Sequence, residues 1–141
     1  MLSQTNLMKR VDLFIAPFIE YILQSFSGYC VSTSLLLSEP KAPCQDRKHY
    51  DFDTAVIGTE CFSVVVPLNL SATLEIEVEE AKKDCAEWWM PVTVCPHQFF
   101  KFDGTVAHMG GKHEGAKRQY RIHLLFSKTD PKDVNSVCDI V

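Results

Sequence analysis

The strongest constraint on the fold is a series of short segments rich in β-branched and aromatic residues, separated by turn signals. We expect each of these segments to form a strand, because this composition between Gly, Pro and Asp punctuation is typical of β-structure. Apolar and polar residues alternate through Leu74, Ile76 and Val78, and the segment Tyr120 to Phe126 is the clearest strand. The expected strands are 29–37, 61–67, 72–78, 92–95, 99–102, 105–108 and 120–126.

One helical segment precedes these strands and spans residues 5–27. Its apolar side chains recur at helical spacing, for example at Val11, Ile15, Phe18 and Ile22. Pro17 is expected to kink the helix. A helix followed by about seven short strands predicts a mainly β fold, namely a small barrel or jelly roll. A parallel sheet with crossover helices is disfavoured.

The length of 141 residues favours a single domain, 1–141. Within it we expect a helical part over 5–27, a β core over 29–127 and a polar tail over 128–141 that frays. The charged segment 79–87 fits either a short helix or a surface loop.

The cysteine pattern bears on the compartment. The six cysteines include no C-x-x-C pair, which disfavours a zinc ribbon. The N-terminus lacks a signal-peptide layout, so we expect reduced thiols and an intracellular, cytoplasmic protein. Charged residues interrupt the longest apolar stretch, so no membrane span is expected. A net charge of −4 gives no indication of nucleic acid as a partner.

A candidate metal site begins with His49-Tyr50-Asp51. In a strand, residues two apart point to the same face, so the imidazole and the carboxylate could converge on one ion. The H-x-D pattern alone is common by chance and needs a third ligand from elsewhere. A site of two histidines and one carboxylate leaves octahedral positions open, unlike a closed zinc site.

A third ligand and a carboxylate-binding residue both follow in the sequence. His108 stands at the end of an expected short strand, after the turn signal Asp103-Gly104. Arg118 and Arg121 come shortly afterwards, and a guanidinium can hold a carboxylate through two parallel hydrogen bonds.

This order of motifs resembles the iron(II)- and 2-oxoglutarate-dependent dioxygenases, whose fold is a double-stranded β-helix, a kind of jelly roll. The resemblance covers about residues 29–127. It is carried by the loop 38–45, by His49-Tyr50-Asp51, by Val64-Val65-Val66-Pro67-Leu68-Asn69, by the segment 102–110 and by Arg121-Ile122-His123-Leu124.

The resemblance implies that His49, Asp51 and His108 hold Fe(II). It also implies that 2-oxoglutarate and O₂ are cosubstrates and that a hydroxylation follows. Arg121 is the preferred residue for binding 2-oxoglutarate, and Arg118 is the rival. An odd number of positions separates the two arginines, so on a regular strand only one can point inward.

Two other functions remain open. The chain could be an inactive or truncated binding module on the same fold, or a cupin-like metal protein of other activity. The primary substrate is not specified by the sequence: a protein side chain, a small metabolite and a methylated base all fit the resemblance.

Several other residues have simpler interpretations. We expect His113 to be a solvated loop residue and His123 to pack or hydrogen-bond on the last strand without binding metal. Asp53 lies too far along an extended chain from His49 to replace Asp51. The segment Cys95-Pro96-His97 is interpreted as a strand end and turn, and Trp88-Trp89 as packing residues.

Overall fold

The computed structural model describes residues 16–22, 24–25, 27–44, 48–52, 60–78 and 89–128. Residues 16–22 and 24–25 are helical. The strands in this part of the chain are β1 (Cys30–Ser38), β2 (Cys61–Pro67), β3 (Ala72–Glu77), β4 (Trp89–Val94), β5 (Phe100–Asp103), β6 (His108–Gly110) and β7 (Gln119–Ser127).

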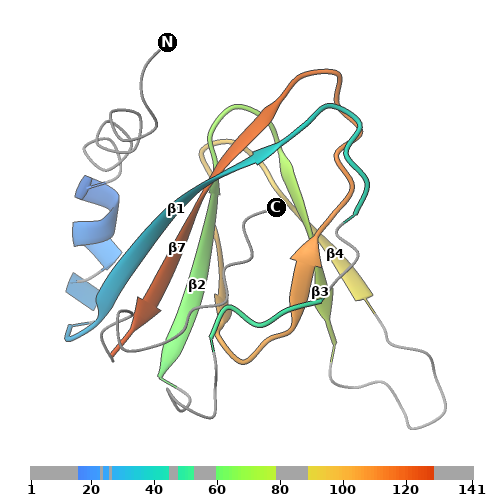
Figure 1. The fold of residues 1–141 in the computed structure, drawn as a ribbon. Coiled ribbons are helices and arrows are strands. Elements are labelled where there is room, and N and C mark those ends of the chain that lie inside the picture. Colours follow the sequence, from blue (N-terminus) through green and yellow to red (C-terminus); the bar gives the residue numbers. More distant parts are fainter. Residues whose placement is uncertain are drawn as a thin grey trace, which may run out of the picture.

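The strands form two antiparallel sheets that face each other (Figure 1). One has the order β1-β7-β2-β5 and the other the order β4-β3-β6. The long strand β7 lies between β1 and β2, so the last strand of the chain joins the middle of the larger sheet. This architecture confirms the predicted mainly β jelly roll with an N-terminal helix.

The helix covers the outer face of the larger sheet, beside β1, β7 and β2 (Figure 1). Ile22 of the helix belongs to a buried apolar cluster to which β2 and β7 contribute every second residue. The Phe62 and Phe126 rings stack there at 4.5 Å between centroids. The buried members are Ile22, Phe62, Val64, Ile122, Leu124 and Phe126.

The inner face of the same sheet is partly polar. On β7 it carries Gln119, Arg121 and His123, all of them buried. The residues opposite them on β1 are Ser38, Leu36 and Ser34. A smaller apolar cluster closes the space between the sheets, with Val65 and Phe102 from the larger sheet and Leu74 and Ile76 from β3.

Most predicted strands agree with the structure to within one or two residues. The exceptions are β4, which begins earlier than expected, and the strand predicted over 105–108, which was wrong. There, Val106 N donates to Asp103 O at 3.1 Å and closes a turn. His108 therefore begins a strand instead of ending one.

Some predictions fall outside the described residues. They concern the helix before residue 16, the segment 79–87 and the tail after 128. Among the described residues, no helix is long and apolar enough to cross a membrane.

Candidate metal centre

The structure brings His49, Asp51 and His108 together. One ligand atom of each lies within 4.8 Å of those of the other two. Asp51 Oδ1 lies 3.9 Å from His49 Nε2 and 3.4 Å from His108 Nε2. Asp51 and His108 are buried, whereas the side chain of His49 is 37% exposed. Two members of the cluster are thus buried, and the third, His49, reaches solvent.

A β-bridge between the backbones of His49 and His108 brings their side chains together. His49 N donates to His108 O at 2.9 Å, and His108 N donates to His49 O at 3.0 Å. The bridge sets the two imidazole rings 4.4 Å apart. Asp51 lies in a bend, so the expectation that His49 and Asp51 share a face of a regular strand was wrong. An isolated bridge and a bend, instead of strand alternation, place the side chains.

The two oxygens of Asp51 have different surroundings. Oδ1 faces the imidazoles of His49 and His108, whereas Oδ2 accepts a hydrogen bond from Ser63 Oγ and lies 3.0 Å from His123 Nε2. Burial by itself would raise the pKa of Asp51. The contacts with His108 and His123 outweigh that effect and hold the pKa well below the usual carboxyl value. The side chain is therefore a carboxylate, which is the form that binds metal.

His123 was expected to pack or hydrogen-bond on the last strand, and the structure buries it there beside Asp51, a contact that the sequence interpretation did not predict. It is 5% exposed, and its Nε2 has no hydrogen-bond partner among the described residues. The 3.0 Å approach to Asp51 is close enough for a hydrogen bond, but the N–H is not aligned with the oxygen. The sequence signal for this inward orientation was its position two residues after Arg121, because residues two apart on a strand face the same side.

The two candidate arginines lie in different environments. Arg121 is 8% exposed and donates to Ser38 Oγ at 2.8 Å and to Gln119 Oε1 at 3.0 Å. Both acceptors are neutral, and burial lowers the pKa of Arg121. Arginine nonetheless stays charged in proteins, so a cation lies between the sheets without an acidic partner in the described part of the chain.

Arg118 lies on the surface just before β7. Its Nε donates to Glu39 Oε2 at 3.1 Å, and both side chains are more than half exposed. The guanidinium is thus paired with a carboxylate outside the sandwich.

The structure corrects one other histidine. His113 was expected to be solvated, yet it is buried, with Nε2 2.7 Å from Lys117 O. Its ring lies against Gly115, where a Cβ would clash. Asp53 and Trp88 lie outside the described residues. The turn predicted at residues 95–97 is confirmed by a hydrogen bond from Gln98 N to Cys95 O at 3.0 Å.

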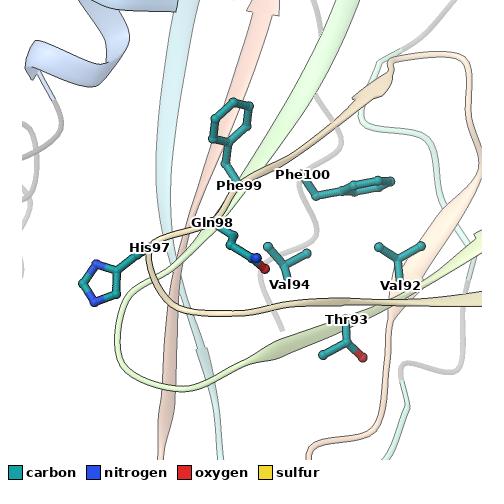
Figure 2. A pocket seen from close by; sticks show the side chains of 7 residues that line it. All are labelled: Val92, Thr93, Val94, His97, Gln98, Phe99 and Phe100. Carbon is teal, nitrogen blue, oxygen red and sulfur yellow. The ribbon is translucent and has the colours of Figure 1, made fainter.

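A hollow lies beside the edge strands β4 and β5, apart from the histidine cluster. Figure 2 shows Val92, Val94 and Phe100 beside this hollow, while His97 points away from them. Among the described residues that line the hollow, His97 is the one titratable side chain. The described lining of the hollow therefore has few groups that could bind a metal or react with a ligand.

The donors of the cluster fit a divalent transition metal. Two imidazoles and one carboxylate are the ligands that non-haem Fe(II) takes on one face of an octahedron. No fourth side chain belongs to the cluster among the described residues. The arrangement thus fits a site with open positions.

Comparison with known proteins supports the fold. No protein-family model matches the sequence, and a search of curated proteins finds no match. Among solved structures, AviO1 from Streptomyces viridochromogenes Tue57 is similar, with a TM-score of 0.55 and 15% identity over 70% of this chain. EvdMO1 gives 0.57 and 17% over 72% of this chain. An oxalate oxidase in complex with the substrate analogue glycolate gives 0.50 and 12% over 76%.

These similarities concern the fold alone. The matches cover 51% of AviO1, 27% of EvdMO1 and 46% of the oxalate oxidase. This chain thus spans about half or less of the length of these proteins.

Proposed function

We propose that the chain is an Fe(II)- and 2-oxoglutarate-dependent dioxygenase that hydroxylates a substrate. One observation carries this proposal: a buried arginine without an acidic partner lies on the strand that also reaches the carboxylate of the candidate metal centre. Arg121 and His123 are two positions apart on the inner face of β7, about 7 Å along the strand. Because His123 Nε2 lies 3.0 Å from the Asp51 carboxylate, a cation two positions earlier on the same face suits a small dicarboxylate whose other end binds the metal.

In this proposal His49, Asp51 and His108 hold the metal. Asp51 is buried and ionised, and both imidazoles approach the same oxygen of its carboxylate. Three protein ligands on one face leave positions for a bidentate 2-oxo acid and for O₂. The partial exposure of His49 places solvent access on its side of the cluster.

Arg121 would bind the far carboxylate of 2-oxoglutarate. Leaving a charge buried among neutral groups is unfavourable, and an incoming carboxylate would relieve that cost. Ser38 and Gln119 already hold the guanidinium in a fixed orientation, so little side-chain entropy is lost when the anion binds. Arg118 has its own carboxylate partner on the surface and is not assigned this role.

Bound Fe(II), 2-oxoglutarate and O₂ supply the chemistry, which converts 2-oxoglutarate to succinate and CO₂ and hydroxylates a C–H bond. The chain orients the cosubstrate between the metal and Arg121. Phe102, which packs with Val65 between the sheets, lies edge-on to His108 at 4.7 Å between ring centroids and gives the cluster an apolar wall.

A cupin-like metal protein of other activity is the second candidate. The observation that favours it is His123, a third histidine 3.0 Å from Asp51, because the two-histidine, one-carboxylate site of the first candidate does not include it. In that case 2-oxoglutarate would have no effect on the metal.

Anaerobic titration separates the two candidates. Fe(II) with 2-oxoglutarate should give a weak visible charge-transfer band in the wild-type chain. The band should vanish in His108→Ala. In Arg121→Met the metal should still bind while the band requires far more 2-oxoglutarate. Metal binding with no spectral response to 2-oxoglutarate would contradict the dioxygenase and favour the second candidate.

The primary substrate is then found by its effect on turnover. In air, the dioxygenase should release succinate slowly on its own and faster with its substrate. Candidate protein side chains, small metabolites and methylated bases should be screened for stimulated succinate formation.

A further inference from the structure

We propose that His123 is a positioning residue for the metal centre. Its side chain holds the Asp51 carboxylate so that only Oδ1 faces the metal. Ser63 acts on the same carboxylate oxygen as its partner. This inference rests on the proposed metal site but not on the use of 2-oxoglutarate.

Two neighbouring strands present these side chains. His123 of β7 lies opposite Val65 of β2, and Ser63 is two positions before Val65 on the same inner face. Both side chains are buried, and both reach Oδ2 of Asp51 from the sheet. Asp51 itself comes from a separate bend, so rigid strands hold a carboxylate that its own loop would leave free to turn.

The unpartnered nitrogen identifies the role. A buried imidazole nitrogen without a hydrogen bond is costly, and among the described residues the Asp51 carboxylate is the charged group beside it. A carboxylate only accepts, so His123 must carry its proton on Nε2 to donate. Nε2 already lies 3.0 Å from Oδ2, so a small rotation of the ring would align the N–H and give this oxygen a second donor beside the Ser63 hydroxyl.

The alternative is that His123 binds the metal as a fourth ligand. The geometry opposes it, because His123 Nε2 lies by Oδ2 while the other imidazoles lie by Oδ1. The ring of His123 is 6.1 Å from that of His108, against 4.4 Å between His49 and His108. His123 also falls outside the group whose ligand atoms all lie within 4.8 Å.

Positioning has a measurable consequence. A carboxylate held through one oxygen binds through the other alone and keeps the remaining metal positions open. Loss of such a supporting contact typically lowers metal affinity about 10- to 100-fold.

The test uses Co(II) as the probe, with the full chain, and without 2-oxoglutarate. His123→Leu removes the donor and should weaken Co(II) binding about 10- to 100-fold in calorimetric titration. His123→Gln places an amide N–H where Nε2 lies and should restore most of the affinity. The visible Co(II) absorption should keep the wild-type shape in His123→Gln. His113→Gln, a buried histidine away from the cluster, is the matched control and should leave both readouts unchanged.

A second variant tests the shared oxygen. Ser63→Ala should also weaken Co(II) binding, and the double variant with His123→Leu should depart from the sum of the two effects, because both donors act on Oδ2. If His123→Leu does not fold, as judged by circular dichroism, His123→Gln and Ser63→Ala still decide the matter.

Each outcome has a distinct meaning. Wild-type affinity in His123→Leu would overturn the positioning role and leave the proposed function standing. An altered Co(II) spectrum in His123→Gln, with affinity as low as in His123→Leu, would overturn it in favour of a fourth ligand. A wild-type chain that binds no Co(II) would overturn the metal site and this inference together.

Discussion

The two faces of β7 are buried to a similar extent but differ in chemistry. The outward residues Ile122, Leu124 and Phe126 have no exposed surface and pack under the N-terminal helix. The inward residues Arg121 and His123 are 8% and 5% exposed, and both are ionisable. One strand therefore separates an apolar layer from a polar one by alternation alone.

The difference shows where stability and function are located. Burying apolar side chains stabilises a fold, whereas burying polar or charged groups without full pairing opposes it. The apolar outer layer thus lowers the free energy of the folded state, and this offsets the cost of burying the polar inner face. We interpret the inner face as built for a ligand. Among the described residues, the Arg121 guanidinium is held by neutral acceptors alone, and the Nε2 of His123 makes no hydrogen bond.

Phe126→Ala should give the largest change in stability. Phe126 is fully buried and stacks on Phe62, so its removal leaves a cavity and should lower the free energy of unfolding by about 3–5 kcal/mol. Urea denaturation followed by circular dichroism measures this. If the folded variant lost Co(II) affinity as strongly as it lost stability, the separation of the two layers would be refuted.

Arg121→Met should weaken ligand binding without lowering the stability of the fold. Loss of a buried, charged hydrogen-bonding partner should weaken 2-oxoglutarate binding by about 2–5 kcal/mol. The free energy of unfolding should stay the same or rise, because a buried cation is replaced by an apolar chain. Anaerobic calorimetry on the metal-loaded chain gives the affinity, and urea denaturation gives the stability. A destabilised variant with normal 2-oxoglutarate affinity would show that Arg121 is structural.

Gly104→Ala tests how tightly the inner face is closed beside Leu125. A Cβ at Gly104 would overlap Cys61 Sγ and come within 2.7 Å of Phe52 Cδ2, and both side chains pack with Leu125. Overpacking of this kind should cost about 1–3 kcal/mol. Combining it with Cys61→Ala should restore part of that loss. Equal unfolding midpoints for Gly104→Ala and the wild type would mean that the space there adapts.

Arg118→Met should have the smallest effect. The arginine and its partner Glu39 are exposed, and such pairs contribute little to stability. Neither the urea midpoint nor the 2-oxoglutarate affinity should change measurably. A loss of 2-oxoglutarate binding here, with Arg121→Met unaffected, would reverse the assignment of the two arginines.

Local patterns predicted the strands well, because alternation and turn residues act over a few positions. The apolar series Leu74 and Ile76 marks the buried side of β3, and Asp103-Gly104 marks the turn that follows β5. The same rule predicted that Arg118 and Arg121 would differ, and the structure places the first on the surface and the second between the sheets. Alternation failed for 105–108, where the Asp103 carboxylate binds Thr105 N at 2.8 Å and favours a turn over a strand.

The sequence by itself determined the residue types: an H-x-D pair, a distant histidine and an arginine on an alternating final strand. Only the tertiary structure decided that His49 pairs with His108 through the backbone, that Ser63 and His123 reach one oxygen of Asp51, and that His113 is buried. The physical reason is range. Hydrophobic alternation is a property of neighbouring residues, whereas these contacts join segments far apart in the chain, and only the packing of the two sheets fixes which side chains meet.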